Sequence, residues 1–186
     1  TLQLHAGRTG NRLLITVDGI RMNTAIFRSG NLQNVISLDP FIMDKTEVLF
    51  GPGSVNYGSD AIAGVMNFYT LPAALSPDGK PYMSGNASAR FSSADKEYTG
   101  HFNVNIGLKK WAFVTSFSQF NFDEIRMGKN GPDEYLRFVY AQNVNGLDVV
   151  TNNDDPRIQR PSGYSQTNVM QKIRFQPNEK WDFSYG

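Results

Sequence analysis

The second half of the chain, from Tyr82 onward, alternates apolar and polar residues with a period of two. In the clearest stretch, residues 98–107, large apolar residues share one parity and polar residues share the other. Such alternation is typical of a strand with one apolar and one polar face. The pattern predicts five strands, at residues 82–91, 98–107, 111–122, 168–175 and 181–185.

Two kinds of fold contain strands of this type. In a soluble β-sandwich the apolar face points inward, whereas in a membrane barrel it points outward to lipid. A strand of about 11 residues is about 36 Å long and, tilted by about 45°, rises about 25 Å, which is the height of the apolar band of an outer-membrane barrel. Sandwich strands usually have about 5–6 residues. We therefore predict antiparallel transmembrane β-barrel strands, whose polar set, including Lys172 and Arg174, faces the lumen.

The links between the predicted strands also differ in length. The links after Ile106 and Phe175 are tight, whereas residues 92–96 and especially 123–163 form longer links. Outer-membrane barrels have short turns on one side and longer loops on the other. Residues 123–163 are therefore predicted to be a long extracellular loop.

One predicted strand changes parity along its length. Trp111, Phe113 and Phe117 share one face, but Phe120 and Phe122 fall on the other. A β-bulge would produce this change, and so would the end of an apolar band. Both explanations remain open at this point.

Residues 1–71 follow a different pattern, with short apolar runs between Gly- and Asn-rich turns. The runs at 13–17, 46–50 and 65–70 predict short strands, and residues 59–63 predict one helical turn. We expect a small mixed α/β domain over residues 1–71. A linker rich in proline is expected at 72–81, and the barrel strands over 82–186.

Composition narrows the choice of function. The 186 residues contain 18 Lys+Arg against 17 Asp+Glu, a balance that gives no reason to expect a nucleic-acid partner. The chain has no cysteine, which excludes thiolate metal sites. It contains no Gly-x-Ser-x-Gly motif and no complete phosphate-binding loop. We therefore expect neither an enzyme nor a bound cofactor.

Three blocks in the first half resemble the plug domain of TonB-dependent outer-membrane receptors. The first, residues 13–23, reads LLITVDGIRMN; the second is 36–40 with 46–48; the third, 51–67, reads GPGSVNYGSDAIAGVMN. Their order and spacing make the resemblance specific, and it covers about a third of the chain.

The resemblance implies a fold and a function. In this family a barrel of roughly 22 strands follows the plug, so about five of them would lie here, and we expect the sequence to be a fragment. The implied function is TonB-dependent active import of a scarce ligand (siderophore, haem, cobalamin or similar) across the bacterial outer membrane. The expected partners are TonB, through a segment upstream of Thr1, outer-membrane lipid and a small extracellular ligand. The alternatives are a soluble β-sandwich carbohydrate-binding module and a passive porin.

The resemblance also implies site residues. Residues 21–31 match a plug loop that rises toward the ligand, and the candidate contacts are Arg21, Asn23, Phe27, Arg28 and Asn31. The alternative is that these residues only pack the plug against the barrel wall. The family usually carries arginines where Ala6 and Phe50 stand here, so we expect the plug to be held differently, by Arg8 or Arg12.

Three further groups have a functional and an ordinary interpretation. His101 is a haem or metal ligand, or simply polar lining of the lumen. The run Asn152 to Asp155 is a Ca²⁺ site or a solvated loop, and its spacing matches no EF-hand. We predict that four aromatic residues form girdles at the membrane interfaces, namely Tyr82, Trp111, Trp181 and Tyr185.

Overall fold

The computed structural model describes residues 13–22, 38–51, 53–58, 61 and 64–186. The chain divides into two compact units. The first comprises the described residues of Thr1–Tyr82 together with Ile106–Val114 and Lys172–Gly186. The second comprises Met83–Asn105 and Thr115–Gln171.

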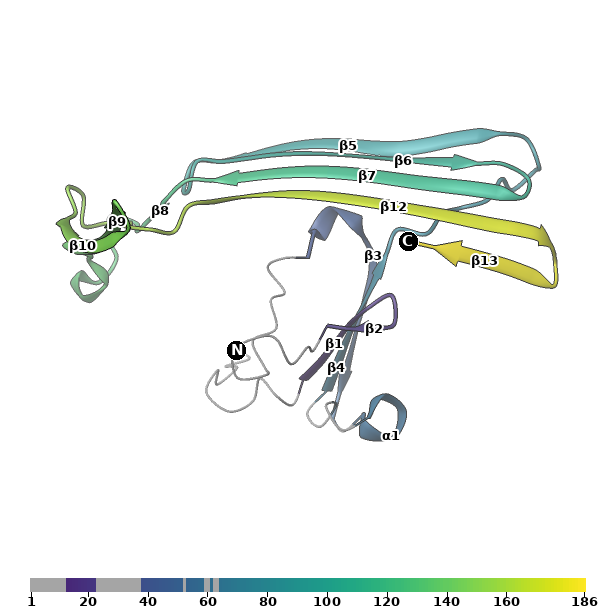
Figure 1. Ribbon diagram of the computed structural model, residues 1–186, viewed down its shortest axis with the longest axis horizontal. Coiled ribbons are helices and arrows are strands. Elements are labelled where there is room, and N and C mark those ends of the chain that lie inside the picture. Colours follow the sequence, from purple (N-terminus) through teal and green to yellow (C-terminus); the bar gives the residue numbers. More distant parts are fainter. Residues whose placement is uncertain (1–12, 23–37, 52, 59–60, 62–63) are drawn as a thin grey trace. The chain divides into compact units, whose positions relative to one another are not determined.

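A four-stranded mixed sheet forms most of the described first seventy residues. Its order is β2-β1-β4-β3, and its strands are β1 (Leu13–Val17), β2 (Ile20–Arg21), β3 (Met43–Phe50) and β4 (Gly64–Thr70) (Figure 1). β1 runs parallel to β4, whereas β3 runs antiparallel to it. Asp18 and Gly19, both with positive φ, make the tight turn into β2. Leu14, Ala61 and Val65 are buried completely and form the core.

Two short helices accompany this sheet. The 3-10 helix η4 (Pro40–Ile42) begins after Asp39, whose carboxylate accepts a hydrogen bond from the Phe41 amide. The α-helix α1 spans Ser54–Tyr57 and ends at Gly58, whose φ of 87° is left-handed. The helical turn predicted at residues 59–63 lies largely outside the described residues, and the helix that is described comes earlier.

A five-stranded sheet contains a strand at each of the five predicted segments. Its order is β13-β12-β7-β6-β5, and adjacent strands run in opposite directions (Figure 1). The strands are β5 (Tyr82–Ser92), β6 (Glu97–Gly107), β7 (Trp111–Phe122), β12 (Tyr164–Asn178) and β13 (Trp181–Tyr185). At 15 residues, β12 is longer than predicted.

The predicted long loop contains secondary structure of its own. β8 (Ile125–Arg126) pairs with β11 (Ile158–Gln159), and η5 (Asp133–Tyr135) follows β8. β9 (Val139–Val144) and β10 (Leu147–Asn152) form a hairpin through Asn145 and Gly146, both with positive φ. Asn-Gly between two apolar runs is a strong hairpin signal, so this hairpin within residues 123–163 could have been predicted from the sequence.

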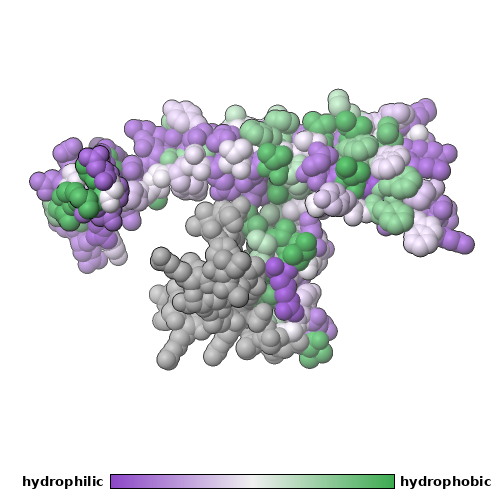
Figure 2. Space-filling view, viewed as in Figure 1, coloured by the Kyte–Doolittle hydropathy of each residue, from purple (hydrophilic) through white to green (hydrophobic). Residues whose placement is uncertain are grey.

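The two faces of β6 are buried in the reverse of the order usual in soluble proteins: the polar face is buried and the apolar face is exposed. Its polar residues, including His101 and Asn103, are buried, whereas Phe102 is 47% exposed. Figure 2 shows hydrophobic residues on the visible surface of the five-stranded sheet. On β12, Val169 is 71% exposed. Among the described residues, no helix is long and apolar enough to cross a bilayer.

The burial pattern of β7 distinguishes the two explanations for the change of parity at Phe120 and Phe122. Burial alternates without interruption from Trp111 to Asn121, so Phe120 shares the buried face with Ala112 and Val114. The aromatic residue changes face because the sequence changes, while the alternation itself continues. Of the two explanations, the end of an apolar band fits this observation and a bulge within the strand does not.

Candidate functional site

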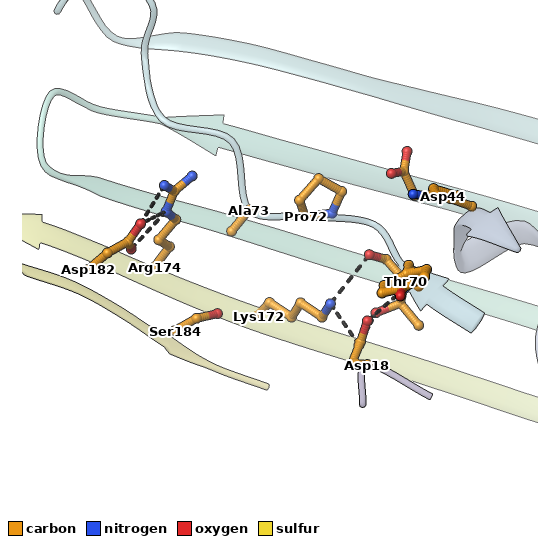
Figure 3. A pocket seen from close by; sticks show the side chains of 11 residues that line it. Asp18, Asp44, Thr70, Pro72, Ala73, Lys172, Arg174, Asp182 and Ser184 are labelled. Atoms are coloured by element: carbon orange, nitrogen blue, oxygen red, sulfur yellow. Dashed lines mark hydrogen bonds and ion pairs between the residues drawn. The ribbon is translucent and has the colours of Figure 1, made fainter. Parts of the chain in front are cut away.

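A pocket of about 660 Å³ lies within the first unit (Figure 3). Residues from β3, β4, β12 and β13, the turn after β1 and the start of the linker line it: Asp18, Asp44, Lys45, Tyr69, Thr70, Pro72, Ala73, Lys172, Arg174, Asp182 and Ser184. Three bases (Lys45, Lys172, Arg174) and three acids (Asp18, Asp44, Asp182) are among them. The pocket is therefore polar and balanced in formal charge.

The carboxylate of Asp18 is contacted by both Thr70 and Lys172. One carboxylate oxygen accepts the backbone N–H of Thr70 at 2.9 Å, and the other accepts the Thr70 hydroxyl at 2.6 Å. The ammonium of Lys172, on β12, lies 2.9 Å from that second oxygen and 3.4 Å from the Thr70 carbonyl oxygen (Figure 3). Three segments distant in sequence meet at this carboxylate.

The ionisation of Asp18 follows from these contacts. Partial burial alone raises the pKa of a carboxyl group. The hydrogen bonds from Thr70 and the ion pair with Lys172 outweigh burial, so the pKa of Asp18 lies below its ordinary value of 3.8. Asp18 is therefore charged at neutral pH and attracts the Lys172 ammonium.

A second ion pair lies in the same pocket. The guanidinium of Arg174 donates two hydrogen bonds, at 2.9 and 2.6 Å, to the two carboxylate oxygens of Asp182 on β13 (Figure 3). Such a two-point contact holds the planar guanidinium in one orientation. Lys172 and Arg174 thus present two cations from one side of β12, each with its own acid.

In the second unit, buried polar side chains of β6 form hydrogen bonds with one another and with side chains of the neighbouring strands. Glu97 accepts from Arg90 and Thr99. The His101 ring bonds through Nδ1 to the Ser118 hydroxyl at 2.7 Å and through Nε2 to Asn103 at 3.0 Å. Because both ring nitrogens of His101 are occupied, its geometry fits the polar-lining interpretation. The described residues contain no cluster of three or more His, Asp or Glu able to hold a metal.

Aromatic rings gather near the strand ends in each unit. In the first, Trp111 stacks on Phe175 with centroids 4.2 Å apart, and Trp181 stacks on Phe183 at 5.7 Å. In the second, two pairs lie beside the longer links: Phe91–Tyr98 at 5.0 Å and Phe122–Tyr164 at 4.6 Å. Three of the four residues predicted for girdles are well exposed: Trp111, Trp181 and Tyr185.

The run Asn152 to Asp155 is only partly solvated, because Asn152 and Asp154 are exposed whereas Asn153 is only 6% exposed. The amide nitrogen of Asn153 donates to the carbonyl oxygens of Arg137 and Ile158 at 2.8 Å each. Asp155 pairs with Arg126 at 2.9 Å. The hydrogen bond from the Arg157 backbone helps to hold the pKa of Asp155 below its ordinary value. The Asn153 amide nitrogen and the Asp155 carboxylate therefore hold the loop together, which the sequence run alone did not indicate.

Only one of the predicted ligand contacts is described. Arg21 lies exposed on β2, and its guanidinium donates to the Tyr57 carbonyl oxygen beside Gly58. The other candidates, Asn23, Phe27, Arg28 and Asn31, lie outside the described residues, as do Ala6, Arg8 and Arg12. Phe50, where an arginine was expected, is exposed at the end of β3.

Sequence reasoning missed the partnership of Asp18 and Lys172. The prediction that Lys172 faces the lumen was the sequence signal available for this contact. However, no sequence pattern singled out Asp18 for it, and nothing local relates two positions so far apart in the chain.

The family model of the TonB-dependent Receptor Plug Domain matches residues 5–65, which include β1, β2, β3 and α1. The chain carries a TonB-dependent receptor plug domain. The resemblance stated from the three sequence blocks is thereby confirmed. We call the mixed sheet of β1, β2, β3 and β4 the plug sheet.

Two curated relatives extend the similarity beyond the plug. The "Vitamin B12 transporter BtuB" of Vibrio vulnificus (strain CMCP6) is 38% identical over 106 residues, which are 57% of this chain and 16% of that protein. The "Hemin receptor" of Yersinia enterocolitica is 30% identical over 179 residues, 85% of this chain and 24% of that protein. The chain spans about a quarter or less of the length of these relatives.

Solved structures share the fold. The "Copper transporter OprC" has a TM-score of 0.64 at 20% identity, covering 91% of this chain and 21% of that one. The "ferric enterobactin receptor (PfeA)" has a TM-score of 0.53 at 15% identity, covering 91% of this chain and 24% of its own. The described chain therefore shares its fold with parts of these two proteins.

Proposed function

We propose that this chain belongs to an importer that takes up a scarce ligand across the bacterial outer membrane, driven through TonB. The plug domain and the fold of TonB-dependent receptors support this proposal. The names of these similar proteins specify vitamin B12, hemin, copper and ferric enterobactin. Each is a metal or contains one, so we propose a metal ion or a metal chelate (siderophore, haem, cobalamin or similar) as the ligand class.

The observation that carries the membrane part of the proposal is the inverted burial of the five-stranded sheet. Phe102, Ile106 and Val169 are exposed, whereas Asn103 and Ser118 on the opposite face are buried. In water this arrangement costs free energy at every apolar position. In a bilayer the apolar face meets lipid and the polar face lines the interior of the barrel.

The same observation disfavours the β-sandwich alternative, because a sandwich requires these apolar residues to pack together inside. The passive porin is disfavoured by the plug domain, because a freely open pore has no use for a domain that fills it. We further propose that residues 1–71 form the plug, 72–81 the linker and 82–186 the first barrel strands, with 123–163 as an extracellular loop.

Uptake by whole cells tests the function. The full-length receptor gene is expressed in cells that lack their own receptors, with and without functional TonB, and uptake of vitamin B12, hemin and ferric enterobactin is measured separately. The proposal expects uptake of at least one probe that disappears without TonB. Uptake of equal rate with and without TonB would contradict it and favour a porin.

A further inference from the structure

We propose that Asp18 and Lys172 are positioning residues of the import cycle: their ion pair latches the plug sheet to β12, and its opening precedes release of the plug. This inference rests on the proposed function. It concerns a contact that lies wholly within the first unit. The two residues need not touch the ligand, because they act through the plug sheet.

The latch has a defined geometry. Asp18 is fixed from one side by the backbone and the hydroxyl of Thr70, the last residue of β4. Lys172 approaches from β12 and reaches both the Asp18 carboxylate and the Thr70 carbonyl oxygen. The latch thus lies where the plug sheet ends and the chain enters the linker at Pro72. Movement of the linker would reach this point before the rest of the plug sheet.

The surroundings make the pair strong enough to matter. The Lys172 side chain is only 16% exposed. Removal of the Asp18 carboxylate leaves the Lys172 ammonium in a place where water replaces that partner poorly. Loss of the pair should change an opening equilibrium by about tenfold or more.

The ion pair is nevertheless a weaker attachment of β4 than the pairing of β4 within the plug sheet. Within the plug sheet, β4 pairs with β1 over five residues and with β3 over seven. From Lys172, a single ammonium holds the end of β4. An ion pair loses its hydrogen-bond geometry within about an ångström of displacement, whereas a strand ladder requires many bonds to break together. The latch should therefore open while the plug sheet stays folded.

The pocket around the latch provides room for this opening. About 660 Å³ lie beside the pair, and the walls are polar. Arg174 is already occupied by Asp182, so it does not replace Lys172 as the partner of Asp18 (Figure 3). Among the described residues of β12, Lys172 is therefore the cation that contacts Asp18.

Limited proteolysis of the purified full-length receptor in detergent tests the latch. The measured quantity is the rate at which a nonspecific protease cuts residues 72–81. The variants are Lys172→Met, Asp18→Asn and Lys172→Arg, and Lys180→Met, in the exposed turn after β12, is the matched control. We expect Lys172→Met and Asp18→Asn to raise the rate about tenfold. Lys172→Arg and Lys180→Met should stay within about threefold of wild type.

Uptake separates a latch from a merely structural contact. With the probe that wild-type cells import, Lys172→Met should reach half-maximal uptake at a lower level of TonB, because less work is needed to release the plug. A structural defect would instead lower uptake at every TonB level.

Cleavage of Lys172→Met at the wild-type rate, or cleavage of Lys172→Arg as fast as that of Lys172→Met, would overturn the latch. Loss of uptake at all TonB levels by Lys172→Met would also overturn it. A wild-type receptor that imports no probe would instead contradict the proposed function, and the proteolysis result would still decide whether the latch exists.

Discussion

The plug sheet and the five-stranded sheet bury opposite kinds of side chain. In the plug sheet, Leu14 and Val65 are buried completely, whereas exposed apolar residues such as Ile20 and Phe50 lie on the edge strands β2 and β3. In the five-stranded sheet, His101 and Ser118 are buried while Val169 is exposed. The plug sheet follows the rule for proteins in water. The five-stranded sheet reverses it, as the proposed membrane barrel requires.

The core of the plug sheet should be the most sensitive place in the chain. Leu14→Ala removes apolar contacts in a small core and should lower the free energy of unfolding by about 2–5 kcal/mol. Ile20→Ala, 71% exposed in the same sheet, should change it by about 0.5 kcal/mol or less. Hydrogen exchange of the β1 amides in the full-length protein measures both. Equal effects would contradict the buried core.

The outer face of the five-stranded sheet should fail in a different way. Val169→Arg places a charge toward lipid and should cost about 2–4 kcal/mol if it lies at the bilayer midplane. Val169→Leu keeps the apolar character and should be nearly neutral. Unfolding in lipid vesicles, followed by the heat-dependent shift in gel mobility, measures the folded fraction. If Val169→Arg folds as well as wild type in lipid, the face does not meet lipid.

Two glycines of β6 test how tightly its faces pack. A Cβ at Gly107 would lie 2.1 Å from the Tyr82 ring and 2.7 Å from the Ala74 carbonyl oxygen, whereas at Gly100 it meets nothing within 4 Å. Gly107→Ala should therefore cost about 1–3 kcal/mol and Gly100→Ala much less. The same unfolding assay compares them, and a larger loss at Gly100 would contradict the packing described.

The smallest effect expected is the pH dependence of the latch. Because the folded pKa of Asp18 is lowered, its stabilisation is complete above its unfolded pKa, near 3.8, and is lost as pH falls through the lower folded value. Linker proteolysis, with an acid-active protease, should accelerate below about pH 3.8 in wild type. The carboxylates of Asp44 and Asp182 line the same pocket, so Asp18→Asn is the control. An equal acceleration in Asp18→Asn would assign the effect to those neighbours.

The five strands were predictable because each obeys a period of two over many residues. Thr46 to Phe50 and Val65 to Thr70 also became strands, since turn signals bound both runs. The described helix α1 was not predicted because one turn of helix carries too few residues for a periodic signal. The Asn145-Gly146 hairpin was missed although its turn signal was present.

The candidate site was far less predictable than the fold. The alternation placed Lys172 on the polar face, but its partner lies 154 positions earlier in a turn that needs Asp18 for local reasons as well. A contact between distant segments depends on how strands pair, and the sequence of one segment does not determine which strand it pairs with. The buried amide of Asn153 was missed for the same reason.

The central claim is that the apolar face of the five-stranded sheet meets lipid. Because this sequence has no cysteine, single cysteines at Phe102, Val169, Asn103 and Ser116 can carry spin labels in the full-length receptor, with any cysteine outside this segment replaced. In lipid vesicles, oxygen, which concentrates in lipid, should relax the labels at Phe102 and Val169 more than a water-soluble nickel complex does. Labels at Asn103 and Ser116 should not show this preference. A preference for nickel at Phe102 and Val169 would contradict the account.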